Sequence, residues 1–283
     1  MSSELEVKEL LSTKVLSLAD VRCPGGCRHK SAEECVTSLH LVFPYRGVFQ
    51  QHAGKSDFVA EPNQLLFLRP DTPYKISHPV AGGDACLSMT IAPEFFDEIS
   101  HGTESPTKSN SQEQRRGIDP RAQALLAILR HSFNNSIIEL VEAETLALTL
   151  LRRSLGEQTS FRVTARQNLQ KLVDRAKLVL SSDPARNWSL SEIGHEVGVS
   201  PVYLTQVFQK VEGMPLYRYL TRARLNRALD VLGDNPDLTE LALDLGFSSH
   251  SHFSTAFKKT FGSSPSEFRR AMGSDTRATS KTS

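Results

Sequence analysis

The sequence has few of the features that would anchor a protein in a membrane or build a disulfide-bonded scaffold. Only four cysteines occur in 283 residues, too few for a disulfide framework. The longest unbroken apolar run is Ala124–Leu129, whereas about 20 apolar residues are needed to span a bilayer. The first residues, MSSELEVKELL, carry acidic side chains where a signal peptide has a basic segment and an apolar core. We therefore expect a cytoplasmic protein without a membrane-spanning helix.

The sequence also has almost no net charge, but its charge is unevenly distributed. In total 33 Lys and Arg residues stand against 32 Asp and Glu, a net of +1. Residues 1–161 hold 16 basic and 20 acidic side chains, a net of −4, and residues 162–283 hold 17 and 12, a net of +5. A basic half favours contact with a polyanion such as nucleic acid. The alternative is an ordinary charged surface, since +5 is a small excess.

The polar segment Gly156–Arg166 lies between two apolar-periodic regions and predicts a linker between two domains. We assign residues 1–160 to the first domain, 161–168 to the linker, 169–272 to the second domain and 273–283 to a disordered tail.

Short apolar runs separated by Pro and Gly fill residues 36–91 and predict strands of a small β-sandwich or barrel. The runs are VTSLHLVF, GVFQQH, DFVA, NQLLFLRP, YKISH and CLSMTIA. Residues 100–117 are polar and predict a loop.

Apolar residues spaced by three or four predict two amphipathic helices, at about 120–134 and 137–155. Their apolar stripes either pack against the barrel or pair with a second subunit, and the sequence leaves both alternatives open. The candidate dimer contacts are Leu140, Leu148 and Leu151.

An internal repeat occupies the basic half. LSEIGHEVGVSPVYLTQVFQKVEG starts at Leu190, and LTELALDLGFSSHSHFSTAFKKTFG starts at Leu238. In the first copy an amphipathic helix ends at Gly198, and Ser200 with Pro201 begins a second helix. The second helix of each copy buries large apolar residues and leaves a small polar face outside. This is the helix-turn-helix pattern, whose second helix enters the DNA major groove.

The segment between the copies, LYRYLTRARLNRALDVL, predicts a helix that joins them. Its leucines form a buried seam, and four arginines are expected outside: Arg218, Arg222, Arg224 and Arg227. A helix of this length would space the two recognition helices by about 34 Å, one turn of duplex.

With these motifs, residues 169–270 resemble the DNA-binding domain of the AraC/XylS family of bacterial transcriptional regulators, most strongly in GFSSHSHFSTAFKKTFGSSPSEFR. The first half resembles the family's cupin-type sensor domain more loosely, through EPNQLLFLRPDTPYKISHP. Asn63 stands where Gly is common, and Tyr74 stands where metal-binding cupins have His. The second departure argues against a standard cupin metal centre, and no cofactor is expected.

The resemblance implies an α+β chain of two domains, a cupin-like β-barrel with a helical hairpin followed by an all-α domain with two helix-turn-helix units joined by a linker helix. It implies double-stranded DNA, RNA polymerase, an unidentified small-molecule effector and a second copy of the chain as partners. The implied base contacts are Val202, Thr205, Gln206, Gln209, His250, Ser251, Ser254 and Thr255. The implied phosphate contacts are Ser200, Arg218, Arg222, His252, Lys258 and Lys259.

The first half contains all four cysteines and several histidines whose roles stay open. Cys23, Cys27, His29 and Cys35 are close in sequence, but their spacing matches no standard zinc pattern. A weak metal site, a redox-active thiol and ordinary cysteines are the alternatives. A second set could converge inside the barrel as an effector pocket, namely His40, His52, Tyr74, His78 and Cys86.

The motifs G-x-S-x-G and H-E-x-x-H and the P-loop are absent from the sequence. We therefore expect a DNA-binding regulator and not an enzyme, most readily an activator that responds to a signal through its first domain. The rival hypothesis is a cupin-like small-molecule enzyme with an appended DNA-binding module.

Overall fold

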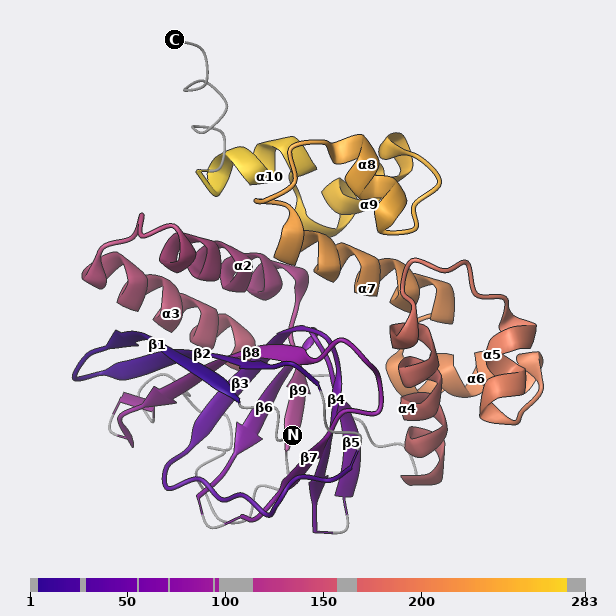
Figure 1. Ribbon diagram of the computed structural model, residues 1–283, viewed down its shortest axis with the longest axis horizontal. Helices are drawn as coiled ribbons and strands as arrows, with labels where there is room; N and C mark the ends of the chain where they lie inside the picture. Colours follow the sequence, from indigo (N-terminus) through magenta and orange to yellow (C-terminus); the bar gives the residue numbers. More distant parts are fainter. Residues whose placement is uncertain are drawn as a thin grey trace.

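The computed structural model describes residues 5–25, 29–54, 56–70, 72–93, 95–96, 114–156 and 167–273. A sheet-rich N-terminal half and a helical C-terminal half lie against each other (Figure 1). No helix in the described ranges is both long and apolar enough to cross a bilayer.

Two antiparallel sheets form the N-terminal half. The larger sheet has the order β1-β2-β8-β3-β6-β9, and the smaller has the order β5-β4-β7. The strands are β1 (Glu6–Ser12), β2 (Leu16–Cys23), β3 (His40–Arg46), β4 (Phe49–Ala53), β5 (Ser56–Ala60), β6 (Gln64–Leu68), β7 (Lys75–Ser77), β8 (Asp84–Ile91) and β9 (Arg115–Gly117). Within the described part no strand ladder joins the two sheets, so they pack as layers, and the closed cupin-like barrel expected from the sequence is not found.

The central strands of the larger sheet are buried on both faces, and alternate side chains of each strand point to opposite faces. On one face Val42, Leu66 and Cys86 pack with Phe49 and Phe58 of the smaller sheet. On the other face the sheet packs against two helices, through the residues Leu18, Leu41, Phe43, Leu87 and Met89.

Those helices are α2 (Pro120–Asn134) and α3 (Leu140–Leu155), the hairpin that the apolar stripes predicted (Figure 1). Asp119 caps α2, its side chain accepting a hydrogen bond from the Ala122 amide. Arg153 of α3 also binds Asp119, with Nε 2.9 Å from Oδ1. The packing alternative for this hairpin is therefore observed for most of both stripes.

The regular secondary structure in the described part of the C-terminal half is helical. Its helices are α4 (Gln167–Ser182), α5 (Leu190–Val197), α6 (Pro201–Glu212), α7 (Leu216–Val231), α8 (Leu238–Asp244), α9 (His250–Phe261) and α10 (Pro265–Ala271). Helix α7 crosses from one helix-turn-helix unit, α5–α6, to the other, α8–α9 (Figure 1). The repeat and its joining helix are therefore confirmed.

The turn chemistry of each unit agrees with the sequence. Gly198 ends α5 at φ 75°, and Gly246 follows α8 at φ 83°, a left-handed conformation that glycine adopts without strain. Ser200 caps α6 by accepting from the Tyr203 amide, and Ser249 caps α9 by accepting from the His252 amide.

Arg224 differs from its expected position on the outside of the joining helix. Its guanidinium is buried and donates to the carbonyl oxygens of Pro184 at 2.8 Å and Gly246 at 2.7 Å, and to two more in the α4–α5 loop. One side chain thus ties the turn of the second unit to the loop that enters the first.

Two other expectations need correction. Strands β1 and β2 precede the region in which strands were predicted, and only alternation in EVKELLS and LSLADVRC could have indicated them. Residues 115–117, predicted as loop, pair with β6 through Arg116 opposite Leu65. Residues 97–113 and most of the predicted linker lie outside the described residues.

We expect Arg224→Met to lower the free energy of unfolding by about 2–4 kcal/mol, because several carbonyl groups lose their donor in a buried place. Arg218→Met is the matched control, since Arg218 lies exposed on the same helix, and its effect should stay within about 0.5 kcal/mol. Urea denaturation of both variants measures the difference. Equal midpoints would show that the guanidinium contributes no net stability.

Candidate DNA-binding surface and interdomain contact

Helix α6 presents a polar face because its apolar residues are used for packing. Leu204, Val207 and Phe208 are buried in the first unit, as the sequence predicted. Val202 is 67% exposed, and Gln206 and Gln209 are exposed beside it. Thr205 is half-buried and donates its hydroxyl hydrogen to the Pro201 carbonyl oxygen at 2.9 Å.

Helix α9 repeats this arrangement. Phe253 and Phe257 are fully buried, while Ser251 and Thr255 are exposed. The half-buried pair His250 and Ser254 are hydrogen-bonded, with Nε2 3.2 Å from Oγ. The outward residues expected from the sequence therefore lie together on this helix.

Polar and basic side chains flank the two helices. Ser200, Arg218, Lys258 and Lys259 are exposed. The His252 ring packs edge-on against Phe247 with centroids 5.3 Å apart, and its Nδ1 lies 3.1 Å from Ser248 Oγ. These positions suit contact with phosphates on either side of a groove.

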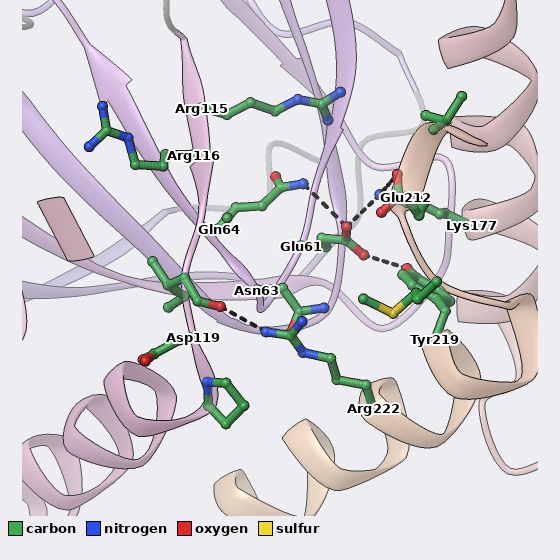
Figure 2. Close-up of a pocket in the computed structure, with 15 residues that line it drawn as sticks. Glu61, Asn63, Gln64, Arg115, Arg116, Asp119, Lys177, Glu212, Tyr219 and Arg222 are labelled. Atoms are coloured by element: carbon green, nitrogen blue, oxygen red, sulfur yellow. Dashed lines mark hydrogen bonds and ion pairs between the residues drawn. The ribbon is translucent and has the colours of Figure 1, made fainter. Parts of the chain in front are cut away.

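A buried charged cluster joins the two halves of the chain (Figure 2). The Lys177 ammonium lies 2.6 Å from Glu61 Oε1 and 2.8 Å from Glu212 Oε1. Glu61 follows β5, whereas Lys177 belongs to α4 and Glu212 to α6. Tyr219 of α7 donates its hydroxyl hydrogen to the other Glu61 oxygen. The Glu61 carboxylate of the sheet half therefore binds α4 and α7 directly, and it is linked to α6 through Lys177.

The electrostatics of this cluster depend on the ammonium. Burial alone would raise the pKa of Glu61, but Lys177 and the hydroxyl of Tyr219 outweigh it and hold that pKa below its ordinary 4.5. Burial opposes the charge of Lys177 as well, yet Glu61 and Glu212 raise its pKa above 10.5. Burial raises the pKa of Glu212, the second carboxylate at the same ammonium.

Arg222 is placed at this contact and not on the open surface. It is half-buried, and its Nη2 donates to the Ile118 carbonyl oxygen at 2.7 Å (Figure 2). Asn226, one turn further along α7, donates to the Pro62 carbonyl oxygen at 2.8 Å. A cavity of about 230 Å³ lies beside Arg222. It is lined by residues of both halves, among them Arg115 and Asp119 of the first half and Lys177 of the second.

Apolar packing adds to the contact at a second place. Ala127 of α2 is buried with Leu229 of α7 and Met272, and Arg130 of α2 binds Asp230 with Nη2 3.0 Å from Oδ1.

The predicted dimer residues do not share one surface. Leu151 is fully buried in the core of its own chain, so it is not available to a second subunit. Leu148 is half-buried against the same core, and Leu140 is 60% exposed. Two further large apolar side chains near Leu140 in sequence are also exposed, those of Ile137 and Val141.

The predicted effector residues fall into separate environments. His40 is half-buried with Nδ1 3.2 Å from Ser88 Oγ, and burial lowers its pKa. His52 is buried, with Nε2 2.9 Å from Ser77 Oγ. Burial and the neighbouring Glu34 raise the pKa of Tyr74 to about 12. Only His78 and Cys86 meet, both beside Asp84.

The cysteine cluster read from the sequence is also divided. Cys23 lies near His78, whereas His29 and Cys35 are exposed, and Cys27 lies outside the described residues. Sequence reasoning did not identify Glu61, Lys177, Glu212 or Tyr219. Isolated charged residues far apart in sequence carry no spacing signal, so only the fold brings them together.

Known proteins resemble this chain most clearly in its second half. Residues 193–271 match the model of a family described as helix-turn-helix domain. The Msm operon regulatory protein of Streptococcus mutans is 32% identical over 102 residues, which cover 35% of this chain and 36% of that protein. The match therefore spans about a third of that relative's length.

A longer match extends into the first half. The thermoregulatory protein LcrF of Yersinia pestis is 27% identical over 231 residues, 81% of this chain and 79% of that protein. Among solved structures, an AraC-type DNA-binding regulator from Chromobacterium violaceum is 28% identical over 38% of this chain and 96% of its own, with a TM-score of 0.36. ToxT from Vibrio cholerae is 13% identical over 92% of this chain and 99% of its own, with a TM-score of 0.36.

We expect Lys177→Met to loosen the contact between the halves by about 3–5 kcal/mol, because the buried Glu61 and the half-buried Glu212 would lose their shared cation. Hydrogen–deuterium exchange in α4 and around Glu61 should rise. Lys171→Met, an exposed site on the same helix, is the control and should leave exchange unchanged.

The pH dependence of this contact should change sign in the same variant. In the wild type the Glu61 contribution is complete above pH 4.5 and is lost as the pH falls through its lowered pKa. In Lys177→Met, protonation of the carboxylates relieves their repulsion. The protection of these amides, measured against the exchange rate of an unstructured chain at the same pH, should therefore increase as the pH falls. Protection that decreases with acid in both proteins would contradict the assigned role of Lys177.

Proposed function

We propose that the chain is an AraC-type DNA-binding transcriptional regulator, in which α6 and α9 read a specific DNA sequence under the control of the N-terminal half. The observation that supports this most directly is the duplicated helix-turn-helix, with polar residues exposed on both second helices.

The proposed base contacts are the outward residues of those helices. On α6 the candidates are Val202, Thr205, Gln206 and Gln209. Each glutamine can donate and accept at an adenine edge, and Val202 suits a thymine methyl group. On α9 the candidates are His250, Ser251, Ser254 and Thr255. Ser200, Arg218, His252, Lys258 and Lys259 are the proposed phosphate contacts, which set register without reading sequence.

Arg222 gives this proposal a conformational element. Its guanidinium binds the Ile118 carbonyl oxygen while the halves are in contact. A phosphate contact by Arg222 therefore requires the halves to separate at least locally. We propose the interdomain cavity, lined by Arg115 and Lys177 among others, as the place where a small effector shifts this equilibrium.

The remaining parts of the proposal rest on the family. The N-terminal half acts as a sensor of the cupin type, the protein works in the cytoplasm, and activation proceeds through RNA polymerase. The alternative of a cupin-like enzyme with a DNA-binding module is less favoured, since the relatives are named as regulators.

We further propose that the chain forms a homodimer through the start of α3. Ile137, Leu140 and Val141 are 55%, 60% and 77% exposed and adjacent, which is unusual for large apolar side chains. Pairing would bury them and would tether two DNA-binding domains, raising avidity through effective concentration.

DNA binding is tested with the full chain and an operator selected from random duplexes. Thr205→Ala with Gln206→Ala should relax preference in one half-site, at about 1–3 kcal/mol per lost base contact. Arg218→Ala should weaken all sequences alike and reduce the slope of log affinity against log salt by about one. Preference unchanged by the double substitution would refute the assigned face of α6, and absence of binding to any selected duplex at low salt would refute the proposed function.

Dimerisation is tested by sedimentation at tens of micromolar. Leu140→Glu with Val141→Glu should give a folded monomer that binds one site weakly, because charges would face each other across the contact. Thr149→Glu, exposed on the same helix, should remain dimeric. A monomeric wild type, with or without DNA, would end the dimer proposal.

A further inference from the structure

Two sheets bring thiol, imidazole and carboxylate groups together at one end of the N-terminal half. Cys23 is the last residue of β2 and pairs with Asp84, the first residue of β8, so their side chains share a face. Cys86 lies two residues further along β8 on that same face. His78 follows β7 of the other sheet and closes the group from the opposite side.

The ligand atoms of three of these residues converge. Cys23 Sγ lies 4.0 Å from His78 Nδ1, and His78 Nε2 is hydrogen-bonded to Asp84. One ligand atom each from Cys23, His78 and Asp84 can be chosen so that all three lie within 4.8 Å of one another. Ligands bonded to one zinc ion at about 2.0–2.3 Å stand about 3.3–3.8 Å apart, so small side-chain movements would suffice.

The surroundings hold these groups in place. His78 and Asp84 are 6% and 8% exposed, and Cys23 is half-buried. The chain after Cys23 lies directly on the Gly82–Gly83 turn before Asp84. A Cβ atom on Gly83 would come within 2.1 Å of the Cys23 carbonyl oxygen, and one on Gly25 within 2.4 Å of the Gly83 nitrogen. Both glycines have positive φ, so this close approach depends on the absence of side chains.

We propose that Cys23, His78 and Asp84 bind one Zn²⁺ ion, with Cys86 as the residue that positions Asp84. Thiolate, imidazole and carboxylate are the ligand types that zinc accepts in proteins. Binding transfers the thiol proton of Cys23 to solvent and leaves one ring nitrogen of His78 for the metal. Cys86 Sγ donates to the second Asp84 oxygen at 3.5 Å, the kind of outer contact that orients a metal-bound carboxylate.

The same three residues could be considered as an activated thiol, with His78 as base and Asp84 as its orienting group. That chemistry needs the nucleophile and base within about 2.6–3.2 Å, somewhat looser before a ligand binds. The 4.0 Å separation of Sγ and Nδ1 is wider than direct proton transfer between the two atoms requires. A bound ion would also connect the larger sheet to the segment after β7, and would so stabilise the packing of both sheets.

The test uses the full chain, freed of metal by a chelator under reducing conditions and titrated with Co²⁺. We expect one equivalent to bind with a thiolate-to-cobalt charge-transfer band and the strong visible bands of a low-coordinate site, and Zn²⁺ to displace it. Cys23→Ser should abolish the charge-transfer band. Cys35→Ser is the matched control, since Cys35 is exposed and outside the cluster, and it should keep the band. Cys86→Ser should keep the band but bind about 10–100-fold more weakly.

A second measurement protects the test against misfolding of a variant. X-ray absorption at the zinc edge of the wild type should show one sulfur at about 2.3 Å together with nitrogen or oxygen ligands. Added Zn²⁺ should raise the melting temperature of wild type and Cys35→Ser alike. The proposal is overturned if the wild type binds no Co²⁺ through sulfur, if the band survives Cys23→Ser, or if Cys23 and Cys86 form a disulfide in a protein that takes up no metal.

Discussion

The arrangement of the two halves depends on one ammonium group buried among carboxylates. Lys177 is 1% exposed, and its partners come from both sides of the interdomain contact. Two carboxylates could not be buried so close together without that cation, since each would be desolvated with no compensating charge. Lys177 is therefore the member on which the polar contact depends, because its removal leaves Glu61 buried without a compensating charge. The apolar packing of Ala127 against α7 holds the halves together at a separate place.

The N-terminal half contacts α7 at two separate places, one polar and one apolar. The α2–α3 hairpin packs one side against the large sheet and part of α2 against α7, so the hairpin contacts both the sheet and the joining helix. A change in the sheet half can reach α7 through Ile118 and Arg222, which are directly hydrogen-bonded. The recognition helices α6 and α9 themselves remain outside this contact with their polar faces exposed.

The sequence was most informative where structure is local. The helix cap at Ser200, the glycine turn at Gly198 and the leucine seam of α7 all follow from short-range rules. The repeat identified α5 to α9 as two copies of one unit with a joining helix. It was least informative where function depends on distant partners. Glu61 and Lys177 are 116 residues apart, and Cys23 and His78 are 55 apart. Arg224 was misplaced for a related reason, since periodicity assigns an arginine to the surface unless carbonyl groups elsewhere in the chain surround it.

Arg224 ties the two helix-turn-helix units to each other beside the joining helix. Its guanidinium hydrogen-bonds both the turn at Gly246 and the loop after α4, and these bonds restrain the distance and twist between α6 and α9. An inserted base pair would displace one half-site by about 3.4 Å along the duplex axis. Recognition helices restrained in this way resist that change in spacing. The nucleic acid must then twist or bend to restore the match, so the flexibility of the unread bases between half-sites becomes part of what is recognised.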